Sequence, residues 1–186
     1  SNLTVNVTTA HGDSETLTLE MVEKEGETYL GSLKTVPGTA VTNDGILQFK
    51  GGDTIRAVYL DGNTVAGPQA EKRLAVSQVV STAAVGFMDG AYREYVHGVF
   101  AGQRTFVRVK DYDADTSDAA DTVHVRLFSQ YVLDPSEEAV AVSADAGPQY
   151  RVRDEIKLNL AETAPHTGFF TGELVIELAP NPEAVN

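Results

Sequence analysis

The chain has 186 residues, with 27 acidic and 14 basic side chains, and its formal net charge is −13. Nucleic acids and anionic membrane surfaces bind clusters of Lys and Arg, so this charge argues against both as partners. The absence of cysteine excludes a disulfide framework, thiol catalysis and zinc–thiolate sites. No apolar run reaches the roughly 20 residues of a membrane span, and the start at Ser1 without a targeting segment predicts a processed protein or an excised piece.

Apolar and polar residues alternate with a period of two along most of the chain, which predicts short β-strands rather than helices. In the first half, turns rich in Gly, Asp and Asn separate the expected strands, as in a β-sandwich. These strands cover residues 3–8, 15–20, 28–33, 46–49, 54–60 and 74–80.

The second half continues this pattern with longer connections, and the segment 92–98 fits no single state. Strands are expected at 83–88, 106–109, 122–125, 155–160 and 168–178, with edge strands near 131–133 and 140–142. The predicted fold class is all-β, with an immunoglobulin-like antiparallel β-sandwich architecture of one large or two small sandwiches. The predicted domains are residues 1–83 and residues 84–186, the second of which contains an acidic loop.

Two stretches of the chain resemble each other, which indicates an internal repeat. The first contains Val5-Asn-Val7, Leu17-Thr-Leu19, Glu23 and Gly31, and the second contains Val123-His-Val125, Ile156-Lys-Leu158, Glu162 and Gly172. The segments that flank the two copies differ. The chain therefore begins partway through one unit and ends partway through the next, or two halves are fused in permuted order.

The acidic loop between the strands 106–109 and 122–125 is the main candidate site. Carboxylates so close together repel one another unless a cation lies among them, and a hard ion with oxygen ligands, calcium above all, suits them. The opening spacing matches an EF-hand, but Thr116 and Thr122 stand where that motif requires Gly and Glu. The loop is thus expected either to bind calcium between two sandwich strands or to be a solvated turn without an ion. The predicted ligands are Asp111, Asp113, Asp115, Asp118 and Asp121.

Four motifs carry a family resemblance: Phe106-Val-Arg-Val-Lys-Asp111-x-Asp113, Asp121-Thr-Val123-x-Val125, Glu162-Thr-Ala-Pro-His-Thr-Gly168-Phe-Phe-Thr-Gly172 and Gly52-Asp53-Thr-Ile55. They resemble the repeated segments of large prokaryotic cell-surface proteins with immunoglobulin-like β-sandwich units. The resemblance covers most of the chain apart from residues about 63–83 and 129–150. It implies an extracellular, surface-layer, adhesive or fibre-forming role rather than a reaction.

The N-terminal strand is the predicted assembly strand, with Leu3, Val5 and Val7 on its apolar face. A sandwich that lacks a strand has an open edge that an extended segment of another copy, or of a neighbouring surface repeat, can fill. Residues 174–178 are a second candidate donor. The alternative is that both strands pair within their own chain.

Two Asn-x-Thr sequons begin at Asn2 and Asn6, on the face of the N-terminal strand that is expected to be exposed. They predict N-glycosylation of a secreted protein.

No sequence motif predicts catalysis. The chain has no GxSxG, P-loop or GxGxxG motif, and its four histidines lack the spacing of metal ligands. Glu23 and Glu162 are a conceivable glycosidase pair, but without Trp to line a cleft, capping of backbone N–H groups is the preferred role. An intramolecular isopeptide bond is left open for Lys34, Lys50, Lys72, Lys110 and Lys157.

The predicted function is therefore that of a non-enzymatic extracellular structural module. It would be a self-assembling subunit of a surface filament or layer, joined to copies of itself by strand donation or edge pairing and stabilised by calcium. The alternatives are an adhesin or carbohydrate-binding module with a glycan ligand, and an accessory domain of a secreted enzyme.

Overall fold

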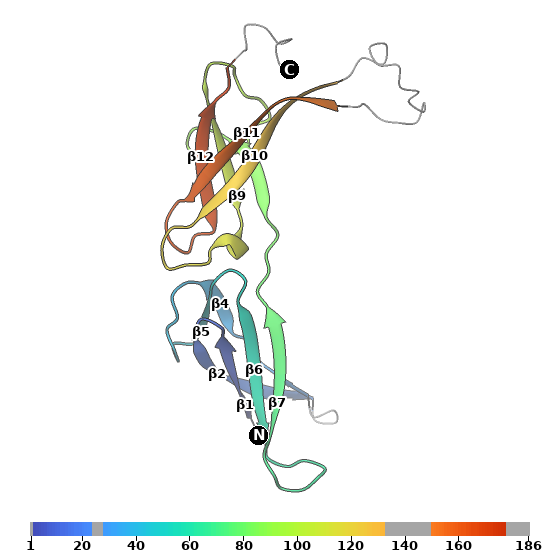
Figure 1. Cartoon of the computed structure of the whole chain (residues 1–186). Helices are drawn as coiled ribbons and strands as arrows, with labels where there is room; N and C mark the ends of the chain where they lie inside the picture. The colour runs from blue at the N-terminus through green and yellow to red at the C-terminus, as the bar shows by residue number, and fades with distance from the viewer. Residues whose placement is uncertain (1, 24–27, 133–149, 178–186) are drawn as a thin grey trace, which may run out of the picture. The chain divides into compact units, whose positions relative to one another are not determined.

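The computed structural model describes residues 2–23, 28–132 and 150–177, with only the backbone of Glu23. These residues form two curled antiparallel β-sheets, which confirms the predicted all-β, sandwich-like class (Figure 1). A single 3-10 turn, η1 (Tyr112–Ala114), is the only helical element in this part of the chain. Among the described residues, no helix has the length and apolar character that crossing a membrane requires.

The first sheet has five strands in the order β3-β2-β1-β6-β7. Its members are β1 (Leu3–Thr9), β2 (Ser14–Glu23), β3 (Thr28–Leu30), β6 (Thr54–Asp61) and β7 (Glu71–Gln78). A parallel pair, β4 (Lys34–Pro37) and β5 (Ile46–Phe49), accompanies it, and β5 lies against β1 and β2. The sequence did not predict β4, because four residues ending in Pro carry too little periodicity to indicate a strand.

The core of this sheet forms where β5 meets β1. Val7 is 7% exposed and Leu47 is 1% exposed, whereas Thr4 and Asn6 point to the solvent. This is the alternation predicted for the N-terminal strand, since successive side chains of a strand point to opposite faces.

The second sheet also has five strands, in the order β10-β11-β12-β9-β8. They are β8 (Ala84–Met88), β9 (Arg104–Lys110), β10 (Thr122–Val132), β11 (Tyr150–Glu162) and β12 (Phe169–Val175). Segment 92–98 forms no strand, although Tyr95 forms an isolated bridge with Met88 of β8. The edge strand expected near 140–142 lies outside the described residues.

The chain divides into two compact units, each built from separate stretches. Unit 1 comprises Ser1–Val85, Val109–Thr122 and Ala161–Phe170, and unit 2 comprises Gly86–Arg108, Val123–Leu160 and Thr171–Asn186. The acidic loop and the turn that follows β11 therefore belong to unit 1. The domain boundary at residue 83 stays a prediction.

The internal repeat is visible as one meander that occurs twice, β1-β2-β3 and β10-β11-β12. A Cβ at Gly31 would lie 2.7 Å from Cδ2 of Leu19, and a Cβ at Gly172 would likewise meet Cδ2 of Leu160. In the first copy the glycine directly follows the third strand and in the second copy it lies on it, and both make room for a leucine on the second strand. These contacts match Leu19 to Leu160. Two residues further along the strand, Glu162 then corresponds to Met21, and not to Glu23 as the sequence comparison predicted.

Candidate metal centre

Two carboxylates of the acidic loop, those of Asp111 and Asp121, hold the loop together. Asp111 caps η1 by accepting a hydrogen bond from the backbone N–H of Asp113 (3.1 Å), and the same oxygen accepts one from the Ser81 hydroxyl (3.1 Å). Asp121 accepts from the backbone N–H groups of Thr116 (2.8 Å) and Ser117 (3.0 Å). Such side chain to backbone bonds give a loop a defined shape without a sheet ladder.

Asp115 does not form such hydrogen bonds. Its exposed fraction is 0%, yet neither of its carboxylate oxygens has a hydrogen-bond partner in the structure. Buried polar atoms in folded proteins nearly always have a partner, so an unpaired pair of oxygens requires an explanation. Asp113 Oδ1 is a further buried oxygen without a partner, two residues earlier in the loop.

Two other carboxylates lie next to Asp115. One oxygen each from Asp115, Asp121 and Glu162 lie within 4.8 Å of one another, and Glu162 is also buried. At such separations, two unit charges repel by roughly 3 to 4 kcal/mol if the effective dielectric constant is about 20. A group of three ionised carboxylates is therefore unfavourable unless a positive charge or a proton joins it.

The pKa of Asp115 reflects these surroundings. Burial raises the pKa of its carboxyl above the ordinary value, and the neighbouring Glu162 carboxylate raises it further. The nearby His166 acts in the opposite direction. The dominant causes thus disfavour a bare Asp115 carboxylate in this position.

Glu162, at the end of β11, is fixed by the turn that follows it. Its Oε1 accepts hydrogen bonds from the backbone N–H groups of Thr167 and Gly168 (both 2.9 Å), and its Oε2 accepts one from Asp121 N–H (3.0 Å). The capping role predicted for Glu162 is confirmed. The same bonds place it beside the acidic loop, 41 residues away in sequence, which sequence spacing did not indicate.

His166 also lies close to Asp115. Its backbone has a φ of 62°, and its Nδ1 lies 3.4 Å from Asp115 Oδ1. Nδ1 is itself buried without a hydrogen-bond partner in the structure. The imidazole therefore sits near the carboxylate but does not satisfy it.

The turn at Gly51 fixes the backbone of Asp115. The N–H of Gly51 donates a 2.5 Å hydrogen bond to the carbonyl oxygen of Asp115. A Cβ at position 51 would collide with the carbonyl of Asp113, so this close approach requires glycine.

Asp118 forms an ion pair instead of joining the carboxylate group. Its side chain is 55% exposed, and Oδ2 lies 2.7 Å from Lys50 Nζ. The hydrogen bonds from Lys50 and from Thr39 lower the pKa of Asp118, which keeps it ionised. Of the five predicted ligands, Asp115 and Asp121 thus lie in the carboxylate group, while Asp111 and Asp118 are engaged elsewhere. Lys50 and Asp118 form an ion pair in the structure, and the isopeptide bond left open for Lys50 stays a prediction.

Three other buried acids of unit 1 have different surroundings. Asp13 accepts from Ser14 N–H and Gln48 N–H, and Glu15 accepts from Asp44 N–H and Gly45 N–H. Asp53 contacts His11 Nδ1 and accepts from the backbone N–H of Lys50. Each of these carboxylates is fully engaged by its own unit, so burial of an acid does not by itself leave oxygens unpaired.

The remaining predicted residues lie at ordinary structural positions. The assembly strand with Leu3, Val5 and Val7 is β1, which pairs with β2 on one side and with β6 on the other. In this structure it therefore follows the alternative of pairing within its own chain. The sequon residues Asn2 and Asn6 are exposed, and Asn6 Nδ2 donates to the hydroxyl of Ser14 (3.2 Å).

Comparisons with known proteins find no protein-family model that matches the chain and no curated protein with a significant match to its sequence. The resemblance to cell-surface repeats therefore rests on the motifs themselves.

Proposed function

We propose that the chain is a non-enzymatic structural module of an extracellular filament or layer, in which copies join through the edges of their β-sheets. The observation that carries this proposal is the outer edge of β7. Among the described residues, β7 pairs only with β6, and all eight of its residues are exposed (Figure 1). An edge of this kind presents unpaired N–H and C=O groups to another chain.

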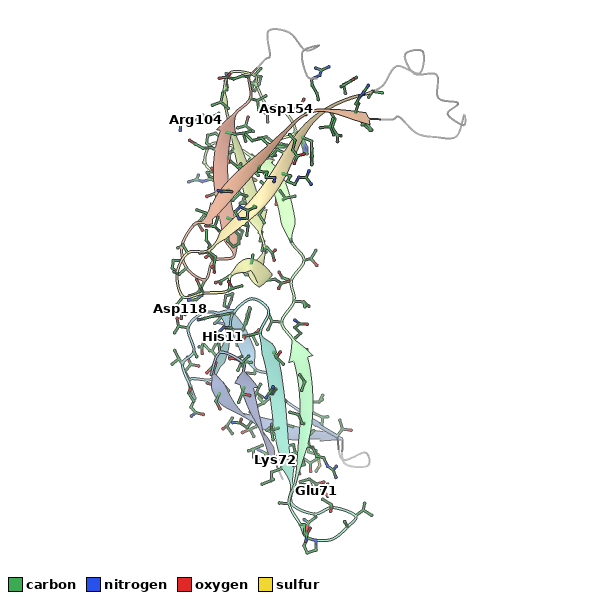
Figure 2. The ribbon with its side chains drawn as sticks, viewed as in Figure 1. His11, Glu71, Lys72, Arg104, Asp118 and Asp154 are labelled. Carbon is green, nitrogen blue, oxygen red and sulfur yellow. The ribbon has the colours of Figure 1, made fainter. Side chains whose placement is uncertain are left out.

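The side chains of β7 strengthen this interpretation. Leu74 is 61% exposed and Val76 is 58% exposed, and both lie on the face that also carries Leu60 of β6, itself 58% exposed. Charges that would repel a second strand are confined to the first three residues, and Figure 2 shows Glu71 and Lys72 at that end. Most natural edge strands carry a charge, a proline or a bulge near the middle, and the stretch from Leu74 to Gln78 has no charge and no proline.

The sequence of β7 is compatible with pairing to a second copy of itself. If two β7 strands meet antiparallel with Leu74 opposite Leu74, then Lys72 lies opposite Val76 and Glu71 lies opposite Ser77. No like charges face each other, and the exposed leucines and valines form one apolar stripe. Cross-strand pairs of this type stabilise a sheet.

A second long edge would allow such contacts to extend an assembly. The eleven-residue β10 is the outer strand of the second sheet. By contrast, β3 has only three residues, and segment 94–96 covers β8 through bonds such as Val96 N–H to Phe87 O. Contacts through two separate surfaces of one chain propagate into layers or filaments, whereas a single isologous contact closes as a dimer.

The surface location in this proposal comes from the motif resemblance and from the charge. A net charge of −13 without cysteine suits a salty or calcium-rich exterior. The resemblance to cell-surface repeats points to the same place.

An adhesin or carbohydrate-binding module is the second candidate. A shallow hollow on the first sheet is lined by Thr4, Asn6, Thr16, Val58, Leu60 and Lys72, which offer hydroxyl, amide and ammonium groups to a sugar. Its lining residues include no aromatic side chain, so we prefer the structural function. Binding of a glycan by the isolated chain would reverse this preference.

The edge proposal is tested by sedimentation velocity across a concentration series. The unmodified chain should form larger species as its concentration rises, and Val76→Lys should stay monomeric because it places a charge in the middle of the edge. Val65→Lys is the matched control, since Val65 is a fully exposed valine outside the strands. Monomeric behaviour of the unmodified chain at all concentrations would contradict the proposal.

A further inference from the structure

We infer that Asp115, Asp121 and Glu162 form a binding site for a hard divalent cation, with calcium as the ion that fits best. This inference rests on side-chain geometry in unit 1 and is independent of the sheet-edge proposal. It also changes the ligand set expected from the sequence, because Glu162 enters and three of the loop aspartates, Asp111, Asp113 and Asp118, leave.

The first step is the unpaired state of Asp115. Both of its oxygens are buried without a donor. A proton would bind only one of the two oxygens and would then itself need an acceptor, whereas a cation can bind both. The two oxygens are therefore suited to bidentate coordination of a metal ion.

The second step is that the neighbouring carboxylates keep coordination capacity. Among the described residues, Glu162 Oε2 accepts one hydrogen bond, from Asp121 N–H, and Asp121 Oδ1 accepts one, from the Ser117 hydroxyl (3.2 Å). Each oxygen has a lone pair left for an ion. The backbone N–H groups that hold the other oxygens orient both carboxylates, as outer-shell hydrogen bonds do at metal sites.

The third step is the kind of ion. Three carboxylates offer only oxygen, and oxygen ligands select calcium and magnesium rather than ions that prefer thiolate or imidazole. Calcium takes six to eight oxygens in flexible geometry, and water can supply those that the three carboxylates do not. Participation of His166 Nδ1 would instead favour zinc, and the comparison of calcium with zinc in the experiment distinguishes the two cases.

The fourth step is a comparison within the same unit. Asp13, Glu15 and Asp53 are as buried as Asp115, but donors of the chain engage their oxygens. Among these four buried acids, Asp115 is the one whose oxygens have no hydrogen-bond donor in the described part of the chain. A cation there would join the acidic loop to the end of β11, since Asp121 comes from the first and Glu162 from the second.

Isothermal titration calorimetry and thermal melting of the full chain test the site, in 150 mM NaCl so that loose counterion binding is screened. Calcium should bind with one-to-one stoichiometry. At about a hundred times its Kd, it should raise the Tm by about 5 to 10 °C. Magnesium should bind more weakly because it requires stricter octahedral geometry, and zinc should not bind more tightly than calcium.

Asp115→Asn should abolish calcium binding and the rise in Tm. In chelator, this variant should melt at or above the Tm of the unmodified chain, because it removes an unpaired buried charge. In calcium, it should melt below the unmodified chain. A carboxylate with only a structural role would not reverse the order of the two Tm values between chelator and calcium. If Asp115→Asn fails to fold, Asp121→Asn and the titration of the unmodified chain serve the same purpose.

Two control variants separate this site from other acidic residues. Asp53→Asn alters a buried acid that the chain itself engages, so it should lower the Tm in chelator and leave the rise with calcium intact. Asp111→Asn should also retain calcium binding, because Asp111 is occupied by Asp113 N–H and Ser81. The inference is overturned if calcium produces neither heat nor a shift in Tm, if Asp115→Asn still binds calcium, or if zinc binds more tightly.

Discussion

The acidic loop shows at the residue scale that one sequence pattern contains carboxylates with different tasks. Asp111 and Asp121 hold backbone N–H groups, Asp118 pairs with Lys50, and Asp115 is buried without a partner. These tasks differ because each side chain meets different donors. The carboxylate with the fewest donors, rather than the most exposed one, is the natural ligand for a cation.

The close approach of the loop to Gly51 leads to a prediction for this residue. Gly51→Ala should lower the free energy of unfolding by about 1 to 3 kcal/mol, because its Cβ would collide with the carbonyl of Asp113 and backbone cannot move aside cheaply. Urea denaturation measures this loss. Gly62→Ala is the matched control, since a Cβ there meets nothing within 4 Å, and it should change the free energy by less than about 0.5 kcal/mol. Equal effects of the two substitutions would show that the loop does not lie against Gly51.

At the scale of elements, the twice-used meander determines which side chains pack. Leu160 is 0% exposed, and Gly172 on the neighbouring strand makes room for it. The corresponding pair in the first copy is Leu19 and Gly31. The repeat therefore preserves a packing contact as well as a sequence pattern.

This contact predicts an unequal response of two leucines. Leu160→Ala should destabilise the protein by about 2 to 5 kcal/mol, because it leaves a cavity in a packed position. Leu74→Ala, at a position that is 61% exposed, should have little effect on the stability of the monomer. Guanidinium denaturation at a protein concentration that keeps the chain monomeric measures both. Similar losses for the two variants would contradict the packing described for β11 and β12.

The elements also show what the sequence could and could not predict. Period-two alternation located most strands, since it depends only on which face of each strand is buried. It missed β4 and underestimated β10 and β11, because their extent depends on pairing partners that are distant in sequence. For the same reason, the sequence predicted a single site made of Asp111, Asp113, Asp115, Asp118 and Asp121. The fold brings two of these, Asp115 and Asp121, together with Glu162.

At the scale of the whole molecule, the position of β1 determines how assembly can occur. This strand is hydrogen-bonded on both sides, so it is an integral part of the first sheet. Among the described residues, β7 and β10 are outer strands of the two sheets, and we propose that contacts with a neighbouring copy form there. The assembly hypothesis therefore concerns pairing between the sheet edges of two copies rather than donation of the N-terminal strand.

Deletion of residues 2–9 tests this distinction. Because β2 and β6 would both lose their partner, the truncated chain should lose the β-sheet signal of the first sheet, as measured by far-ultraviolet circular dichroism and protease sensitivity. The control is the Val76→Lys variant, which should retain both the spectrum and the resistance of the unmodified chain. A truncated chain that remains folded but no longer assembles would instead support donation of the N-terminal strand.

Negative-stain electron microscopy of the purified chain, in calcium and in chelator, tests the central claim most directly. If copies join through the edge of β7, the unmodified protein should form regular filaments or sheets, and Val76→Lys should remain as dispersed particles at the same concentration. Comparison of the calcium and chelator samples shows whether the cation contributes to assembly or only to the stability of each copy. Dispersed particles of the unmodified chain in both conditions would contradict the structural function and bring the adhesin alternative forward.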